Sequence, residues 1–435
     1  MKYTERQITF DKRGHLLNSK QVFSPDGKWV VYDTRNDGTH ISQTETIEVV
    51  NVATKEICEI YRTQNQTEHG PGVGAAAFSP ISEKVIFIHG IRNANAAHPY
   101  SFTRRTGVAI ELKNPGRPIF MDARNIKAPF TAGALRGGTH AHGWSADGEF
   151  ISFTYNDYVL EKLSETNPEV QDLRMVGVMF PQQVKVPDSH DLENHNGEMF
   201  SVIISRLTEN PSPGTDEIDR AFDECWIGEA GYLKANGERQ KRAIAFQGDV
   251  KNDDGKTVTE VFVVDLPKEE ELTRARAGEP LEGTAHMRPG VPKGIEQKRI
   301  TFSKSGIEGP RHWLQSTADG NLIAFLAKDK AGFINAFGVS PNGGEVKQLS
   351  FHPFHIQTGF NFSPDGKLLA YGAENAVYIT EVATGKSDKL TISFSDEEAP
   401  AGPVNWSPCG EKLAYNRYIK EGNTAYLQIF VLTKS

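Results

Sequence analysis

The chain has 435 residues, of which 38% are hydrophobic and 24% are charged, as in ordinary globular proteins. Its formal net charge of −8 provides no basic footprint, which argues against nucleic-acid binding. No apolar run reaches the roughly 18 residues of a membrane-spanning helix, and the 3 cysteines are too sparse for a disulfide framework or a zinc site. The first residues lack an apolar signal region, so we expect a cytoplasmic protein without a membrane partner.

One sequence pattern recurs along the chain and predicts its fold. An aromatic residue is followed by Ser-Pro-Asp-Gly, or a variant of it, and then by an alternating apolar strand. Proline presets the turn, aspartate accepts hydrogen bonds within it, and glycine supplies a positive φ. In chain order the copies begin at Phe23, Phe78, Trp144, Ser316, Phe362 and Trp406.

The spacing of these copies predicts seven repeats. The interval between Ser145 and Ser316 is too long for one repeat, and Arg242–Phe246 resembles a degenerate copy within it. We therefore expect an all-β fold, a single closed seven-bladed β-propeller over residues 1–435, with insertions within about 155–300. Eight blades is the alternative. The insertions are expected to be long loops over Pro181–Gly197 and Thr208–Phe222 and a short helix within Lys268–Pro292.

A second repeated stretch predicts how the ring closes. Arg6–Phe10, Lys298–Phe302 and Lys347–Phe351 share a pattern typical of an outer strand. The first copy precedes every blade, whereas the last blade, which ends near Leu432, lacks one. We therefore predict that the N-terminal strand Gln7–Phe10 completes the last blade, because closure removes exposed sheet edges.

Histidines gather in the stretches that lead into the innermost strands, which meet at one mouth of a propeller channel. His140 and His312 lie at the same offset before the aspartates of their motifs, which predicts a similar depth around the axis. On a regular strand His142 shares the face of His140. The other histidines of this group are His15, His352 and His355.

Neutral imidazoles that converge with an amide oxygen suit a divalent transition metal. We expect manganese first, with iron, nickel and zinc as alternatives. The alternative for each histidine is a solvated or hydrogen-bonded channel residue. The candidate metal ligands are His140, His142, His312, His355 and Gln357.

The whole chain resembles the TolB-type propellers and, within them, a bacterial branch related to oligogalacturonate lyase. Gly138–Asp147 resembles the stretch of the lyase in which Thr-His-x-His supplies two metal ligands. Arg311–Ser316 resembles the stretch that carries its third histidine ligand. Gly137 stands where the lyase has a glutamine ligand, and the two stretches occur in reversed order. The departures leave the substrate open.

The resemblance implies a metal-dependent polysaccharide lyase that acts by β-elimination on oligogalacturonides or other uronate oligosaccharides. The metal and an arginine would neutralise the uronate carboxylate. Arg136 and Arg311, the arginines nearest the histidine stretches, are the catalytic candidates, and His352, Trp313 and His15 are the candidates for binding the anionic oligosaccharide.

Two other functions compete with the lyase. The first is a non-catalytic TolB-like binding or scaffold propeller whose mouth docks a protein or peptide. The second is a serine hydrolase, and the absence of a G-x-S-x-G motif argues against it.

Overall fold

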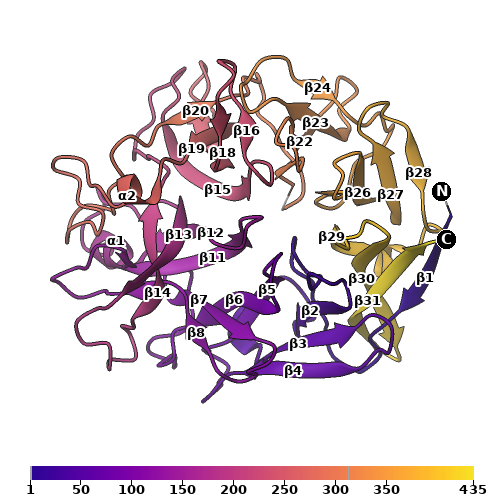
Figure 1. Cartoon of the computed structure of the whole chain (residues 1–435), viewed down its shortest axis with the longest axis horizontal. Coiled ribbons are helices and arrows are strands. Elements are labelled where there is room, and N and C mark those ends of the chain that lie inside the picture. Colours follow the sequence, from indigo (N-terminus) through magenta and orange to yellow (C-terminus); the bar gives the residue numbers. More distant parts are fainter. Residues whose placement is uncertain (1, 312) are drawn as a thin grey trace.

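The computed structural model describes residues 2–311 and 313–435. Seven antiparallel sheets stand as blades around one axis, and we number them 1 to 7 in chain order (Figure 1). Each sheet is a meander that starts near the axis and ends at the outer rim. This arrangement confirms the predicted all-β, seven-bladed propeller.

In blade 1 an irregular segment, bridged to the sheet at Leu16 and Phe23, replaces the innermost strand. From the axis outward, blade 1 consists of β2 (Trp29–Asp33), β3 (Thr46–Asn51) and β4 (Ile57–Arg62), and blade 2 of β5 (Val73–Phe78), β6 (Lys84–Gly90), β7 (Arg105–Glu111) and β8 (Ile119–Phe120). Blade 3 consists of β11 (Gly137–Trp144), β12 (Ile151–Asp157), β13 (Met175–Val184) and β14 (Gly197–Ile203). Blade 4 consists of β15 (Ile218–Trp226), β18 (Ala243–Lys251), β19 (Thr257–Asp265) and β20 (Gln297–Arg299).

Blades 5 to 7 follow the same order. Blade 5 consists of β21 (Gln315–Ser316), β22 (Ile323–Lys328), β23 (Ile334–Val339) and β24 (Lys347–Gln348). Blade 6 consists of β25 (Asn361–Phe362), β26 (Leu368–Ala373), β27 (Ala376–Glu381) and β28 (Ser387–Lys389). Blade 7 consists of β29 (Pro400–Trp406), β30 (Lys412–Glu421), β31 (Thr424–Lys434) and β1 (Tyr3–Gln7). Outside the blades lie β9 (Ala123–Arg124), β10 (Ala134–Leu135), β16 (Tyr232–Leu233), β17 (Arg239–Gln240), helices α1 (Tyr158–Ser164) and α2 (Glu269–Leu272), and 3-10 turns at Ile41–Gln43 and Asp396–Glu398.

The repeated turn joins the first two strands of a blade, as its residue types predict. In the first copy the Ser24 hydroxyl donates to Asp26 (2.7 Å), accepts from the Trp29 amide (3.0 Å), and Gly27 has a φ of 67°. The hydrogen bond from Ser24 lowers the pKa of Asp26 to about 2. Ser145 and Asp147 form the same contacts, so the motif builds one turn in successive blades.

The insertions lie largely where the sequence places them, with shifted bounds. The Arg242–Phe246 copy is confirmed, since Ala243 begins β18, but the preceding turn is expanded into the β16–β17 hairpin. The helix expected within Lys268–Pro292 is α2, whereas α1, capped by Asp157, has no counterpart among the predictions. The two expected loops are too long: β13 continues through Val184 and β15 already begins at Ile218, because their polar residues occupy exposed strand positions.

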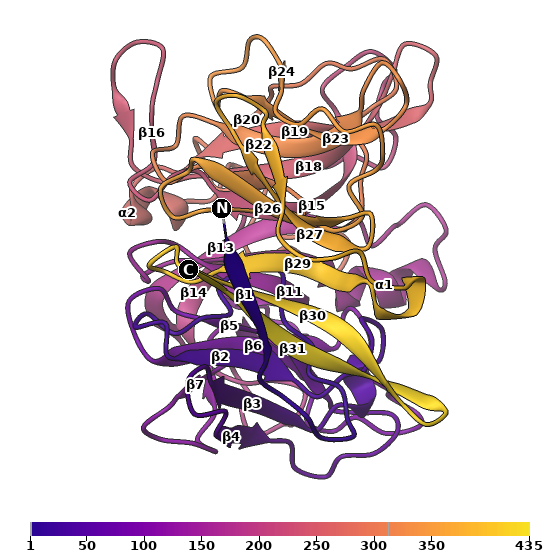
Figure 2. The same cartoon turned by 90° about the vertical axis from the view of Figure 1, so that its right-hand side faces the viewer.

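The N-terminal strand does pair with the last blade, but at different residues from those predicted. β1 runs antiparallel to β31, from Tyr3 opposite Lys434 to Gln7 opposite Phe430, and Figure 2 shows the two side by side. Only Gln7 of the expected segment lies in the strand. The following residues leave it toward blade 1, with the Ile8 amide donating to the Ile429 carbonyl (2.9 Å).

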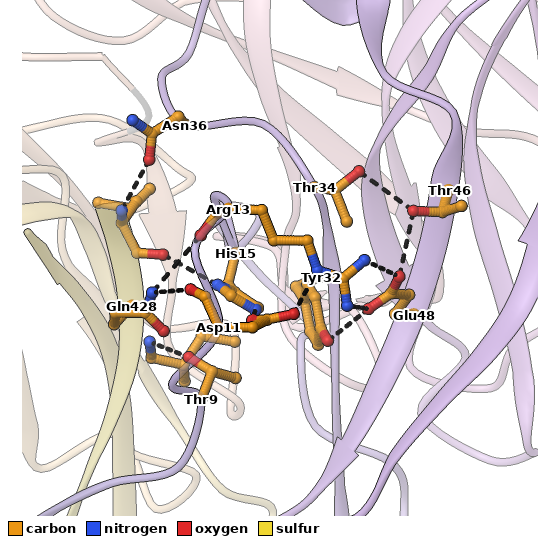
Figure 3. A network of polar contacts seen from close by, with 12 residues as sticks. Thr9, Asp11, Arg13, His15, Tyr32, Thr34, Asn36, Thr46, Glu48 and Gln428 are labelled. Carbon is orange, nitrogen blue, oxygen red and sulfur yellow. Dashed lines mark hydrogen bonds and ion pairs between the residues drawn. The ribbon is translucent and has the colours of Figure 1, made fainter. Parts of the chain in front are cut away.

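A polar network fastens this N-terminal segment between blades 7 and 1 (Figure 3). Arg13 donates two hydrogen bonds to the buried Glu48 carboxylate (2.6 and 2.8 Å), which also accepts from Tyr32 (2.6 Å). His15 contacts Asp11 (2.5 Å) and the Leu427 carbonyl of blade 7 (3.1 Å). Burial and the negative Glu48 raise the pKa of Tyr32, so this phenol stays a donor.

Apolar side chains fill the spaces between neighbouring blades. One cluster of buried residues runs through blades 2 to 4 and includes Ile86, Phe153 and Phe246. Within residues 2–311 and 313–435, no helix is long and apolar enough to cross a membrane.

The seam network predicts a stability difference between two glutamates of blade 1. Glu48→Ala is expected to lower the free energy of unfolding by about 2 kcal/mol, because Arg13 and Tyr32 lose their shared acceptor. Glu45→Ala, which removes an exposed ion pair to Arg62, is expected to cost no more than about 0.5 kcal/mol. Urea unfolding of both variants measures the difference, and equal losses would contradict the role given to the seam.

Candidate functional site

Two adjoining cavities open on the face of the ring opposite the repeated turns. Their volumes are about 710 and 350 Å3, and both are lined by His140, Ala141, Arg174 and Arg311. We call them together the basic cavity. Its walls come from blades 1 to 4, from blades 6 and 7, and from the segment between β20 and β21 that carries Arg311.

Three arginines of this cavity are supported by aromatic rings. Arg105 at the start of β7 and Arg174 just before β13 both lie over the ring of Phe102, at 4.9 and 5.4 Å from its centre. Arg220 of β15 lies 4.4 Å from the centre of the Phe222 ring. Stacking fixes a guanidinium plane while its N–H groups stay directed sideways, which suits the two oxygens of a carboxylate.

The polar contacts of these arginines are few and mostly neutral. Arg174 donates to the Asn156 side-chain oxygen (3.3 Å), and Arg220 lies 3.8 Å from the Asp249 carboxylate. Burial and then the positive charges of Arg220 and Arg105 lower the pKa of Arg174 to about 10. Asp37, Asp223 and Glu308 also line the cavity, but cationic side chains outnumber these carboxylates, so an anionic ligand would offset an excess of positive charge.

His140 lies on β11 in the middle of this charge. Burial, followed by the charges of Arg105 and Arg174, lowers its pKa well below the usual value. The imidazole is therefore neutral at physiological pH. Its Nδ1 atom has no hydrogen-bond partner among the described residues. The cations that keep this imidazole neutral also make it a weak base, and a bound anion that offsets their charge would raise its pKa.

The expectation that His142 shares the strand face of His140 is wrong. The strand bulges between His140 and Gly143, with Ala141 at a φ of 58°, and this left-handed residue breaks the alternation of side chains. His142 is buried and bonds through Nε2 to the Thr139 hydroxyl (3.0 Å), which donates to Asp122 (2.9 Å). It belongs to the interface with blade 2.

The structure places three other candidates around the basic cavity with His140: Arg311, Trp313 and Gln357. Gln357 is exposed, and its oxygen accepts a hydrogen bond from the Asn375 amide (2.9 Å). His312 lies outside the described residues. Four of the expected site residues thus meet at one mouth, although they come from different blades.

Arg136 and His15 do not reach this mouth. Arg136 is fully buried, pairs with Asp157 (2.9 Å) and donates to the Thr284 and Met287 carbonyls, so it anchors an insertion. His15 is fully buried in the seam between blades 7 and 1. Residues that are close along the chain can therefore point their side chains to different sides of a blade.

His352 and His355 also lie away from the arginines. His352 is buried, bonds to the Tyr371 hydroxyl (2.6 Å) and stacks on Phe354 between blades 5 and 6. His355 is exposed, and its Nδ1 accepts from the Ile334 amide (3.1 Å). Both histidines lie in the segment that connects β24 of blade 5 to β25 of blade 6. This segment passes the outer rim before it reaches the axis.

The described residues do not fit the expected metal. In the part of the chain that the structure describes, no three His, Cys, Asp or Glu side chains converge as a metal-binding group. His140 and Gln357 border the same cavity, but His142 is turned toward blade 2. The positive charges that lower the pKa of His140 also disfavour a metal cation beside it.

Three arginines of the cavity were not among the sequence candidates, unlike Arg311. Arg105, Arg174 and Arg220 lie outside the repeated motif, in three different blades. No local pattern brings them together, since only the closed ring does. Their positions near strand ends on the same face are the one signal that a search for mouth-facing cations could use.

Comparison with solved structures supports the fold. The chain is similar to oligogalacturonate lyase in complex with manganese, with a TM-score of 0.55 and 10% identity over 100% of this chain and 97% of that one. It also aligns with the putative TolB from Agrobacterium tumefaciens, with a TM-score of 0.41 and 11% identity over 90% of this chain and 98% of that one. At 10% identity the likeness to the lyase concerns the fold alone.

Comparison of sequences places the chain more closely. Residues 72–195 match a family described as "Protein of unknown function (DUF3748)". Over 416 residues the chain is 38% identical to the "Uncharacterized protein YidR" of Escherichia coli (strain K12), which covers 94% of each protein. The chain therefore belongs to the same family as YidR.

Proposed function

We propose that this protein binds a uronate-containing oligosaccharide in the basic cavity and cleaves it by β-elimination. The observation that carries the proposal is the set of stacked arginines around the neutral His140. Guanidinium groups match carboxylates in shape and charge, and a bound carboxylate would offset the positive charges that lower the pKa of His140, so that the imidazole could act as a base. The lyase of similar fold supports the proposal by analogy only.

The chemistry can be assigned to residues of this chain. Arg174 and Arg311 hold the uronate carboxylate and offset the negative charge that develops when the neighbouring carbon loses its proton. His140 accepts that proton. The electron pair of the broken C–H bond forms a carbon–carbon double bond, the bond to the 4-oxygen breaks, and the departing oxygen takes up a proton from water. The hydroxide that remains takes the proton from His140, which restores water and the neutral imidazole.

No step is assigned to a metal ion. The metal-dependent form of the reaction would require ligands beyond those that the described residues bring together. In the proposed reaction the arginines neutralise the carboxylate instead. Treatment with a chelator separates the two forms of the mechanism.

His140 is expected to be essential for turnover. His140→Ala should lower kcat on oligogalacturonides by about 100-fold or more, because the base is lost, while KM changes little. The ultraviolet absorbance of the unsaturated product measures the reaction. His98→Ala, at an exposed histidine, is the matched control and should keep full activity. Full activity of His140→Ala would refute the assignment, and loss of wild-type activity after chelation would restore a metal to the mechanism.

Arg174 is expected to contribute binding energy through its charge and shape. Arg174→Gln should weaken digalacturonate binding about 10- to 100-fold, because a charge-assisted pair becomes a neutral one. Isothermal titration calorimetry at two salt concentrations measures the loss. Arg117→Gln, at an exposed arginine on the outside of blade 2, should bind like the wild type. Equal affinities of all three proteins would place the ligand elsewhere.

Asp172 is expected to make anion binding depend on pH. Burial raises the pKa of Asp172 to about 7, and Asn156 links this carboxyl to Arg174 by accepting from the arginine (3.3 Å) and donating to the carboxyl (2.8 Å). The carboxyl is neutral below its pKa and negative above it, so it offsets Arg174 only at higher pH.

Inorganic sulfate keeps its charge across this range and therefore isolates the effect of the protein. Its affinity should fall about threefold between pH 6 and 8, an order-of-magnitude value for one added charge partly screened by solvent. In Asp172→Asn the affinity should be flat over the same interval. A pH dependence that persists in Asp172→Asn would assign the effect to another group.

A second candidate function is favoured by the opposite mouth. A cavity of about 690 Å3 on the face of the repeated turns is lined by Trp144, Trp226 and Trp406 and by prolines of the motif. An aromatic wall of this kind suits an extended peptide, as in a binding propeller. If this is the main function, oligogalacturonides should neither bind nor change in absorbance, while peptide binding should alter tryptophan fluorescence.

A further inference from the structure

The axis of the propeller is occupied by four residues of the chain itself. The segment Asn18–Gln21, where blade 1 lacks an innermost strand, bonds to five other blades. Gln21 exchanges hydrogen bonds with both the amide and the carbonyl of Trp144 in blade 3 (3.0 and 2.8 Å). The remaining bonds join Asn18 to Ala75, Gln21 to Phe78, Lys20 to Glu224, Ser19 to Asn361 and Asn18 to Asn405.

Lys20 crosses the axis within this segment. Its ammonium donates to the main-chain carbonyl of Glu224 in blade 4 (3.1 Å), which lies across the ring from blade 1 (Figure 1). The side chain also passes against Gly143 of blade 3, where a Cβ would come within 2.7 Å of the lysine Nζ. One flexible side chain thus bridges the innermost parts of three blades.

The crossing separates the two mouths of the channel. Between the basic cavity and the aromatic mouth remains a space of only about 20 Å3, enough for one water molecule. Lys20 lines this neck, the basic cavity and the aromatic mouth. Glu224 is buried in the same neck, and one of its carboxyl oxygens lacks a hydrogen-bond partner among the described residues.

The contacts that hold the ammonium are ones that an anion can compete for. The ammonium donates to a neutral carbonyl, and it also attracts the Glu224 carboxyl, whose pKa burial raises and the charge of Lys20 lowers. A doubly charged anion competes with both contacts, because charge adds to the strength of a hydrogen bond. The four-carbon stem of lysine lets its charge move several ångströms without a backbone change. A ligand shifts such an equilibrium by its differential affinity for the two positions of the side chain.

We propose that Lys20 is a latch between the two mouths. An anion in the basic cavity draws the ammonium away from Glu224 and loosens the neck, so that the aromatic mouth responds to occupancy of the basic one. The coupling rests on the anion-binding part of the proposed function but not on its chemistry. Lys20 closes the channel even without a ligand, which can be tested separately.

Cys225 provides the readout. It is buried beside Glu224, lines the aromatic mouth, and burial raises the pKa of its thiol to about 12. A loosened neck exposes this thiol, so its rate of alkylation reports the opening. Mass spectrometry of peptides separates it from Cys58 and Cys409.

The first comparison is made without sulfate. In chloride, Lys20→Met is expected to label at Cys225 about tenfold faster than the wild type, because labelling of a buried group follows its local opening. Lys28→Met, at an exposed lysine of blade 1, is the control and should label at the wild-type rate. Gly143→Ala, whose methyl displaces the ammonium, should reproduce the effect if Lys20→Met fails to fold. Wild-type rates in both variants would overturn the latch.

The second comparison adds sodium sulfate at the ionic strength of the chloride buffer. Sulfate should accelerate labelling of Cys225 several-fold in the wild type and leave the already fast Lys20→Met unchanged. If calorimetry shows that sulfate binds while the wild-type rate stays constant, the coupling is wrong although the anion site stands. If sulfate does not bind, both the coupling and the proposed anion site are wrong.

Discussion

Each blade of a propeller has two apolar faces, and both must be covered by neighbours. The fold therefore depends on closing the ring, and here closure depends on the N-terminal segment. β1 supplies the outer strand of blade 7, and the residues after it join blade 1 through Arg13 and the buried Glu48. Polar contacts at this seam add to apolar packing, because Val30 and Val50 of blade 1 share a buried cluster with Ile429 and Val431 of blade 7.

The closed ring also explains the composition of the candidate site. Blades 2, 3 and 4 each contribute one of the ring-supported arginines to this mouth, so positive charge accumulates there by addition from several sheets. Arg105, Arg174 and Arg220 come from blades 2, 3 and 4, and their mutual repulsion is tolerated because aromatic rings hold them. The protein carries a formal net charge of −8, yet this mouth is positive. Local arrangement, not net charge, determines which ligand such a surface attracts.

Local patterns made most of the fold predictable. The repeated turn is specified by neighbouring residues, as the hydrogen bonds between Ser24, Asp26 and Trp29 show, so its copies count the blades. The same reasoning located His140, because a fixed offset from the turn fixes depth along an inner strand. It failed for His142, since the bulge at Ala141 depends on contacts with the neighbouring blade.

Long-range features remained beyond the sequence. Arg136 is next to the histidine stretch along the chain, but Asp157 and the carbonyls of an insertion hold it in the interior. The arginines of the cavity have no shared motif, and the axial segment Asn18–Gln21 carries no signal that it would contact five blades. Convergence of the expected metal ligands is likewise a property of the assembled ring: His140 and Gln357 border one cavity, His142 is turned toward blade 2, and His312 lies outside the described residues.

Bulges divide the inner strands β5, β11, β15 and β29 into two halves. Left-handed residues occur at comparable positions in five blades: Gln21, Ala75, Ala141, Asp223 and Gly402. On one side of this residue the strand leads into the repeated turn, and its aromatic residue packs between blades. On the other side the strand faces the basic cavity. Substitutions there need not disturb the turn, so relatives can acquire new ligand preferences at one mouth while the frame of the ring is inherited unchanged.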